Sequence, residues 1–166
     1  MIQVLFSEIR VSALGDTPVL VLKEAAGPRQ LAIWISAASA ATILAGLEGD
    51  DPRHPATHDL MIDALATLDA VVQSVAIIDE EDGVYDAHLL VNGTAVTCRV
   101  SDGVALALRC GAPIYAADHL LDAAGVRADG AAEVAEEADD QVEQFREFLD
   151  TINPDDFTEG PKNPEG

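Results

Sequence analysis

The chain has 166 residues, which fits one domain with an appendage. Its formal net charge is −21 and it holds only two lysines, Lys23 and Lys162. This weighs against tight nucleic-acid binding by a basic surface, because phosphate affinity depends on Lys and Arg. No apolar run approaches the roughly eighteen residues of a membrane span.

The first part of the chain predicts three strands followed by two helices. Strand patterns cover residues 2–11, 18–23 and 30–35, with a turn at 24–29 that contains a Gly-Pro pair. Ser36 predicts the N-cap of a helix over residues 37–47, and a polar loop follows at 48–56. Thr57 predicts the cap of a second helix. Its apolar stripe, at helical spacing, comprises Leu60, Met61, Ala64, Leu65 and Leu68.

The next part repeats this outline. Strand patterns cover residues 71–78, 84–91 and 94–100, separated by a turn at 80–83 and by Asn92-Gly93, a strong hairpin signal. Ser101 then predicts the cap of an Ala-rich helix from Asp102 to Cys110. The succession strand, turn, strand, serine, helix therefore occurs twice, over residues 19–47 and 84–110. We predict an α+β fold, with a β-β-α internal duplication, a mixed, largely antiparallel sheet and helices packed on it.

The C-terminal part differs in composition, since residues 129–166 hold 13 acidic and 2 basic residues. A strand at 113–116 and a short helix at 117–125 precede a predicted linker at 126–132. An acidic helix is expected over 131–152, and its apolar stripe predicts docking on the sheet of the same chain or across a subunit boundary, of which we favour the homo-oligomer. The predicted domains are 1–127, then 128–158 with the acidic helix and a final turn, then a disordered tail at 159–166.

Two cysteines, Cys98 and Cys110, are too few for a disulfide framework. Their positions in a strand pattern and near a helix end predict buried, reduced thiols. The N-terminus lacks the basic region and cleavage site of a signal peptide. We therefore expect a cytoplasmic protein.

Two polar pairs stand at the starts of predicted helices: His58-Asp59 and Ser101-Asp102. The simpler interpretation is helix capping, because serine accepts from free backbone N–H groups and aspartate favours the positive end of the dipole. The functional interpretation gives metal binding to the carboxylates and proton transfer to His58, whose charge changes near neutral pH. It predicts that all four residues line one polar cleft. The sequence has no Gly-rich phosphate loop and no Cys pair at metal-binding spacing.

Three stretches, in order and spacing, resemble the bifunctional nuclease (DUF151) domain family. His54–Leu60 (HPATHDL) resembles the family's Arg-Pro-x-Thr-His-Asp-Leu. Thr97–Ala107 (TCRVSDGVALA) resembles Asp-Ala-Arg-Pro-Ser-Asp-Ala-Ile-Ala-Leu-Ala. Leu31–Ser36 (LAIWIS), with Ser39-Ala40, resembles Leu-Pro-Ile-Trp-Ile-Gly followed by Glu-Ala. Thr97 and Ser39 thus stand where the family has acids.

This resemblance implies DNase and RNase activity that depends on Mg²⁺ or Mn²⁺. It implies metal binding by Asp59 and Asp102 and a catalytic set of His58, Asp59, Ser101 and Asp102. Arg99 and Arg53 would then contact the substrate phosphate. Because a metal centre needs several carboxylates, the loss of two acids favours a weak or inactive enzyme. The alternative is a non-catalytic oligomeric interaction or regulatory protein.

Overall fold

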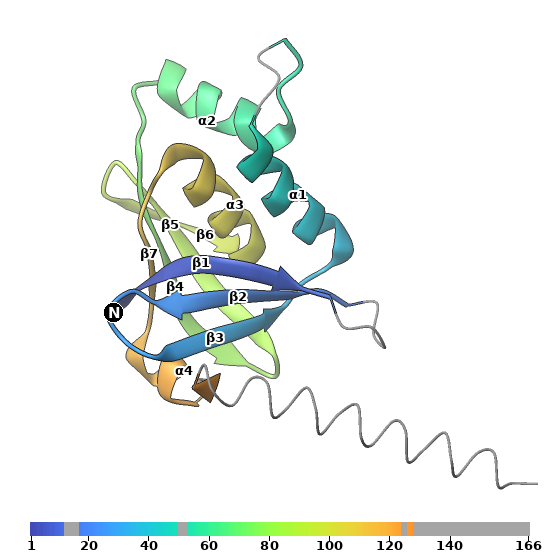
Figure 1. The fold of residues 1–166 in the computed structure, drawn as a ribbon. Coiled ribbons are helices and arrows are strands. Elements are labelled where there is room, and N and C mark those ends of the chain that lie inside the picture. The colour runs from blue at the N-terminus through green and yellow to red at the C-terminus, as the bar shows by residue number, and fades with distance from the viewer. Residues whose placement is uncertain (12–16, 50–52, 124–125, 128–166) are drawn as a thin grey trace, which may run out of the picture. The chain divides into compact units, whose positions relative to one another are not determined.

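The computed structural model describes residues 1–11, 17–49, 53–123 and 126–127. Its strands form one sheet in the order β6-β5-β4-β7-β1-β2-β3-β8 (Figure 1). The strands are β1 (Ile2–Arg10), β2 (Val19–Glu24), β3 (Arg29–Trp34), β4 (Val72–Glu81), β5 (Val84–Val91), β6 (Thr94–Arg99), β7 (Ile114–Ala116) and β8 (Val126–Arg127). The helices are α1 (Ala37–Glu48), α2 (Thr57–Thr67), α3 (Val100–Cys110) and α4 (Asp118–Ala123). Within this part of the chain β4 and β7 pair in parallel and the other neighbours pair antiparallel, so the predicted α+β fold is confirmed.

The internal duplication is present and includes one more strand than predicted. In the first copy β1, β2 and β3 pair in succession before α1; in the second, β4, β5 and β6 pair in succession before α3. The turns of the second copy are Asp82-Gly83 and Asn92-Gly93, and all four residues have positive φ. This backbone matches the right-handed twist of the flanking strands, which is why such pairs favour two-residue hairpins.

Helix α3 is the central helix of the fold. It contacts β4, β5 and β6 as well as α1 and α2 (Figure 1). Seven of its residues are buried: Val100, Ser101, Gly103, Val104, Ala105, Leu106 and Ala107. Small side chains permit this close approach; a Cβ added at Gly103 would lie 2.9 Å from Val75 Cγ1. The start of α3 is therefore fixed within the core.

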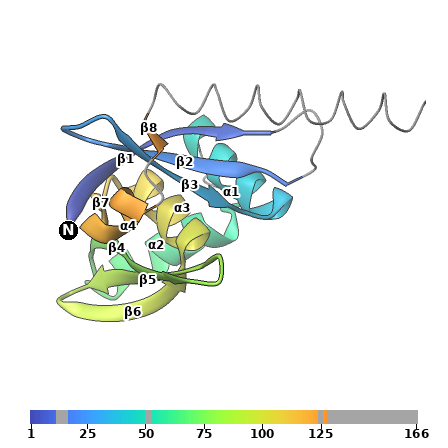
Figure 2. The same cartoon turned by 90° about the horizontal axis from the view of Figure 1, so that it is seen from below.

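The sheet curves, which brings its two halves toward each other. Helix α4 contacts both β3 and β4, although three strands separate them in the sheet. In Figure 2, β1–β3 and β5–β6 lie on opposite sides of α3 and α4. The Arg29 guanidinium of β3 links α4 to the sheet. It contacts Glu24 of β2 at 2.9 Å and two residues of α4, Asp118 at 3.1 Å and Asp122 at 2.6 Å.

Two of the three predicted helix caps are wrong. Ser36 caps α1, where its hydroxyl accepts from the Ser39 N–H at 3.1 Å. Helix α2 already includes Thr57, and α3 already includes Ser101 as its second residue; neither has a side-chain cap. Helix α3 begins earlier because Val100 enters the core, which draws the chain into the helix before Ser101. Ser36 and Ser101 therefore do not occupy equivalent positions.

The predicted apolar stripe of α2 is also wrong. Leu60, Met61 and Leu68 are exposed, and the partly buried face carries His58, Asp59, Ile62 and Leu65. These four lie at helical spacing, so α2 turns its polar first-turn residues toward α3. This rotation places His58 and Asp59 against the central helix.

Three further predictions concern the ends and the cysteines. Cys110 is exposed rather than buried, while Cys98 is half-buried, and both are free thiols.

Val126 and Arg127, predicted as linker, pair with Gln30 and Arg29 of β3. The chain divides into two units, Met1–Ala128 and Asp129–Gly166. The acidic helix predicted for 131–152 lies outside the described residues, as does the tail. In the part that is described, no helix is long and apolar enough to cross a membrane.

Candidate functional site

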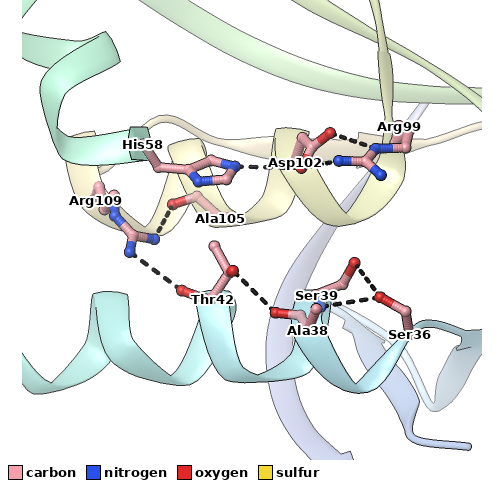
Figure 3. Close-up of polar contacts among 9 residues, drawn as sticks. All are labelled: Ser36, Ala38, Ser39, Thr42, His58, Arg99, Asp102, Ala105 and Arg109. Carbon is pink, nitrogen blue, oxygen red and sulfur yellow. Dashed lines mark hydrogen bonds and ion pairs between the residues drawn. The ribbon is translucent and has the colours of Figure 1, made fainter. Parts of the chain in front are cut away.

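Three of the predicted site residues meet where α2 faces the start of α3. His58 Nε2 lies 3.2 Å from Asp102 Oδ1, across an interval of 44 residues in the sequence. Arg99 Nε donates to Asp102 Oδ2 at 2.6 Å, and its Nη2 donates to Oδ1 at 3.1 Å. Figure 3 shows this row, with Asp102 between His58 and Arg99. We call it the His58–Asp102–Arg99 cluster.

The cluster keeps Asp102 ionised at neutral pH. Partial burial pushes the pKa of Asp102 upward, but the hydrogen bonds and charge of Arg99, followed by those of His58, outweigh it. The pKa therefore lies below the usual range of an aspartate. An ionised Asp102 fixes the orientation of the imidazole, as carboxylates do in histidine-based catalytic sites.

The cluster opens onto a cavity of about 360 Å³. His58, Arg99 and Asp102 line it together with apolar side chains of α2, α3, β5 and β6, Met61 and Leu89 among them. The Arg99 side chain is 77% exposed, whereas His58 is only 18% exposed. Cys98 also lines this cavity, but burial and the Asp102 charge raise the pKa of its thiol. Cys98 therefore lines the cavity as a neutral thiol and does not serve as a thiolate nucleophile.

Asp59 faces a different partner. Its Oδ1 accepts from Arg109 Nε at 2.6 Å, and the two side chains are 14% and 6% exposed. Arg109 also donates to the carbonyls of Ala105 at 3.0 Å and Thr42 at 3.1 Å (Figure 3). This buried ion pair ties α1, α2 and α3 together, so the contacts of Asp59 are those of a structural residue.

The residues do not fit the metal site that the resemblance implies. A Mg²⁺ or Mn²⁺ centre needs carboxylate oxygens that are free to bind the ion. Here Asp59 is held by Arg109, and both oxygens of Asp102 are held by Arg99. Residues 1–11, 17–49, 53–123 and 126–127 contain no group of three His, Cys, Asp or Glu side chains placed to hold a metal. Thr97, where the family has an acid, lines the cavity without supplying a carboxylate.

The single polar cleft predicted for four residues is therefore divided. His58 and Asp102 share one cavity, Asp59 lies in the ion pair with Arg109, and Ser101 lines a second cavity. Arg53, predicted to contact substrate, is exposed in the loop before α2 and does not line either cavity.

Sequence reasoning missed Arg109, the residue that decides the role of Asp59. One signal was available, since Arg109 directly follows the apolar run Val104–Leu108 of the helix, and such a charge needs a partner when buried. It also missed the second cavity, which Trp34, Ser36 and Ser39 line with Ser101 and Tyr85. These residues belong to different copies of the duplication, so no local pattern joins them.

Comparison with known proteins shows which family the chain belongs to. The model of the bifunctional nuclease domain matches residues 20–129. The chain is 43% identical over 153 residues to the uncharacterized protein MT1877 of Mycobacterium tuberculosis (strain CDC 1551 / Oshkosh). The same identity holds for the uncharacterized protein Rv1829 of Mycobacterium tuberculosis (strain ATCC 25618 / H37Rv). Each alignment covers 90% of this chain and 93% of the relative. The chain belongs to the bifunctional nuclease domain family.

Proposed function

We propose that the chain is a nuclease that cleaves single-stranded RNA in the cavity of the His58–Asp102–Arg99 cluster. The observation that carries the proposal is the cluster itself, in which one carboxylate joins a histidine to an exposed arginine. Membership of the bifunctional nuclease domain family supports the choice of a phosphodiester substrate.

Each member of the cluster has a role in this chemistry. When the N–H group at His58 Nε2 donates a hydrogen bond to the Asp102 carboxylate, the lone pair of Nδ1 is free to accept a proton. Arg99 carries five N–H donors, and Asp102 accepts from two of its nitrogens. The remaining donors of this exposed side chain can bind a phosphate oxygen and neutralise its charge.

These groups suit RNA better than DNA. His58 Nδ1 takes the proton of the 2′-hydroxyl, the 2′-oxygen bonds to phosphorus, and the bond from phosphorus to the 5′-oxygen breaks. The leaving 5′-oxygen takes a proton from water, the hydroxide formed is neutralised by the proton that His58 releases, and the products are a 2′,3′-cyclic phosphate and a 5′-hydroxyl. The nucleophile is part of the substrate, so this reaction does not require a metal-activated water. DNA lacks that hydroxyl.

The test compares end-labelled single-stranded RNA and DNA of the same sequence, with EDTA and with Mn²⁺. We expect RNA cleavage in EDTA, a 2′,3′-cyclic phosphate end, and no cleavage where a 2′-deoxy nucleotide replaces the reacting one. His58→Ala should lower the rate by about 100-fold or more, the usual contribution of a general base. His119→Ala is the matched control, because His119 is an exposed histidine that bonds Asp79, outside the cluster.

Cleavage that persists in both His58→Ala and Asp102→Ala would show a contaminant and not this site. Cleavage only with Mn²⁺, giving 3′-hydroxyl ends, would contradict the proposed chemistry and restore the metal-dependent interpretation.

A non-catalytic interaction protein is the second candidate, and the exposed apolar side chains of α1, of α2 and of the residue after α2 favour it. Five large apolar side chains are exposed there: Leu44, Leu47, Leu60, Met61 and Leu68. Such side chains favour burial against another surface, including a second copy of the chain. Light scattering of purified protein would show a homo-oligomer, and Leu60→Glu with Leu68→Glu should dissociate it. A monomer at micromolar concentration would contradict this candidate.

A further inference from the structure

The cavity that contains Ser101 lies where the two copies of the duplication meet. It measures about 310 Å³, a volume within the usual range of small-ligand sites. The start of α1 supplies Ser36 and Ser39, the junction of β6 and α3 supplies Arg99 and Ser101, and Gly83 and Val84 line the cavity from the connection between β4 and β5. We call it the serine cavity.

Charge sets the serine cavity apart from the rest of the chain. The net charge of the protein is −21, and Glu80, Glu81 and Asp82 directly precede the lining residues Gly83 and Val84, yet no Asp or Glu is among the residues that line the cavity itself. Its polar groups are hydroxyls and one guanidinium. A surface of this kind accepts an anion, which the acidic remainder of the protein repels.

Ser101 is the observation that points to a ligand. The residue is only 8% exposed and is the buried polar residue of the described core. Its hydroxyl has no hydrogen-bond partner among the residues that the structure describes. Across the same residues, no side-chain oxygen or nitrogen that is sealed from solvent lacks a partner. The Ser101 hydroxyl therefore opens into the serine cavity, where only a ligand or water can satisfy it.

Further donors surround the same space. Helix α3 has no side-chain cap, so the backbone N–H groups of its first turn remain without a side-chain acceptor. Such N–H groups, with the helix dipole, bind phosphate. Ser36 Oγ donates to Ser39 Oγ at 2.9 Å, which leaves the Ser39 hydroxyl proton available. The Arg99 guanidinium lines this cavity as well as that of the cluster.

Aromatic side chains supply the second half of a nucleotide site. Trp34, the single tryptophan of the chain, is 68% exposed although it belongs to a strand of the sheet. Tyr85, half-buried, lines the same cavity. An exposed indole beside a phosphate-binding group is the arrangement on which a nucleobase stacks.

We propose that the serine cavity binds a nucleoside monophosphate unit, with its phosphate at Ser39, Ser101 and the start of α3, and its base on Trp34. The unit is either a free nucleotide or one residue of a single strand. The proposal does not require cleavage at His58, because the two cavities have separate walls apart from Arg99.

Trp34 makes the test direct, since the intrinsic tryptophan fluorescence of the whole chain reports this one position. Full-length protein is titrated with adenosine 5′-monophosphate, adenosine, inorganic phosphate and a short oligoadenylate. We expect saturable quenching by the monophosphate and weaker binding of adenosine and of phosphate alone. Tighter binding of the oligoadenylate than of the monophosphate would identify the ligand as one residue of a single strand. The reverse order would identify the ligand as a free nucleotide.

Variants assign the binding to the serine cavity. Ser101→Ala removes one oxygen from a buried position and should raise the dissociation constant about tenfold, as loss of a hydrogen bond to a charged group does. Thr67→Ala, an exposed hydroxyl at the end of α2 that lines neither cavity, should leave it unchanged. Trp34→Leu, followed by calorimetry, should weaken the monophosphate but not inorganic phosphate.

His58→Ala should retain the full affinity for the monophosphate, which separates this proposal from the proposed cleavage. Absence of saturable quenching by both the monophosphate and the oligoadenylate at millimolar concentration would overturn the proposal. An unchanged dissociation constant in a folded Ser101→Ala variant would overturn it equally.

Discussion

The ion pair between Asp59 and Arg109 gives the sharpest test of how this site is divided. If Asp59 is structural, Asp59→Ala leaves the Arg109 guanidinium, only 6% exposed, without its charged partner. If Asp59 is instead a metal ligand, the same substitution relieves repulsion between carboxylates, and the metal-free protein should be as stable as before or more stable.

The expected cost follows from the burial of the pair. Removal of one member of a buried ion pair costs about 3–5 kcal/mol. Arg109 keeps its hydrogen bonds to Ala105 and Thr42, and Asp59 retains some contact with solvent, so the low end applies. We expect a loss of about 3 kcal/mol in the free energy of unfolding, or about 10 °C in Tm for a unit of this size.

Urea denaturation followed by circular dichroism measures this loss, with a fall in the midpoint of about 1.5 M expected. Asp63→Ala is the control, because it removes the same charge from an exposed position on the same helix. Asp59→Ala combined with Arg109→Met should be more stable than the sum of the single variants predicts, since the unpaired charge is gone. A midpoint for Asp59→Ala equal to that of Asp63→Ala would refute the structural role.

Two further predictions concern the start of α3. Burial raises the pKa of Asp102, but Arg99 and then His58 lower it by more, so the pKa lies below its usual value in the folded protein. Ionised Asp102 therefore stabilises the fold fully above about pH 3.9, the usual pKa of an unfolded aspartate. This contribution is lost as pH falls through the lower pKa of the folded state. The difference in urea midpoint between the wild type and Asp102→Asn should therefore be present at neutral pH and shrink below pH 4; a difference that does not shrink on acidification would contradict it. Gly103→Ala adds a Cβ that would lie 2.9 Å from Val75 Cγ1 and 3.3 Å from Cys98 Sγ. The cost of this overpacking exceeds the gain in helix propensity, so we expect the free energy of unfolding, measured by urea denaturation, to fall by about 1–2 kcal/mol. A variant as stable as the wild type or more stable would show that the core adapts.

Sequence patterns predicted the elements well where local chemistry decides the structure. Asn92-Gly93 forms its hairpin, and Ser36 caps α1 with the expected hydrogen bond. They failed where tertiary contacts decide. Helix α3 begins at Val100 because that side chain is buried, a fact that no capping signal contains. The two residues of β8 are too short for any periodicity and form a strand only because β3 offers an unpaired edge.

The candidate site shows the same division between local and tertiary information. Thr57-His58-Asp59 and Arg99-Val100-Ser101-Asp102 are alike as sequences, with polar residues ahead of an apolar helix. The sequence correctly predicted that His58 and Asp102 lie close together, but it could not show that Asp59 and Asp102 have different roles.

What separates them is the position of one arginine relative to each carboxylate. Arg99 precedes Asp102 by one helical turn and is exposed, so the pair it forms stays accessible at a cavity. Arg109 comes from the far end of α3 and is buried, so the pair it forms joins three helices. Exposed and buried ion pairs differ in what they can do: an accessible arginine can bind a substrate anion, whereas a buried one cannot leave its partner without a large loss of stability. The accessible pair, with His58 beside it, is therefore where chemistry on a phosphodiester should be sought.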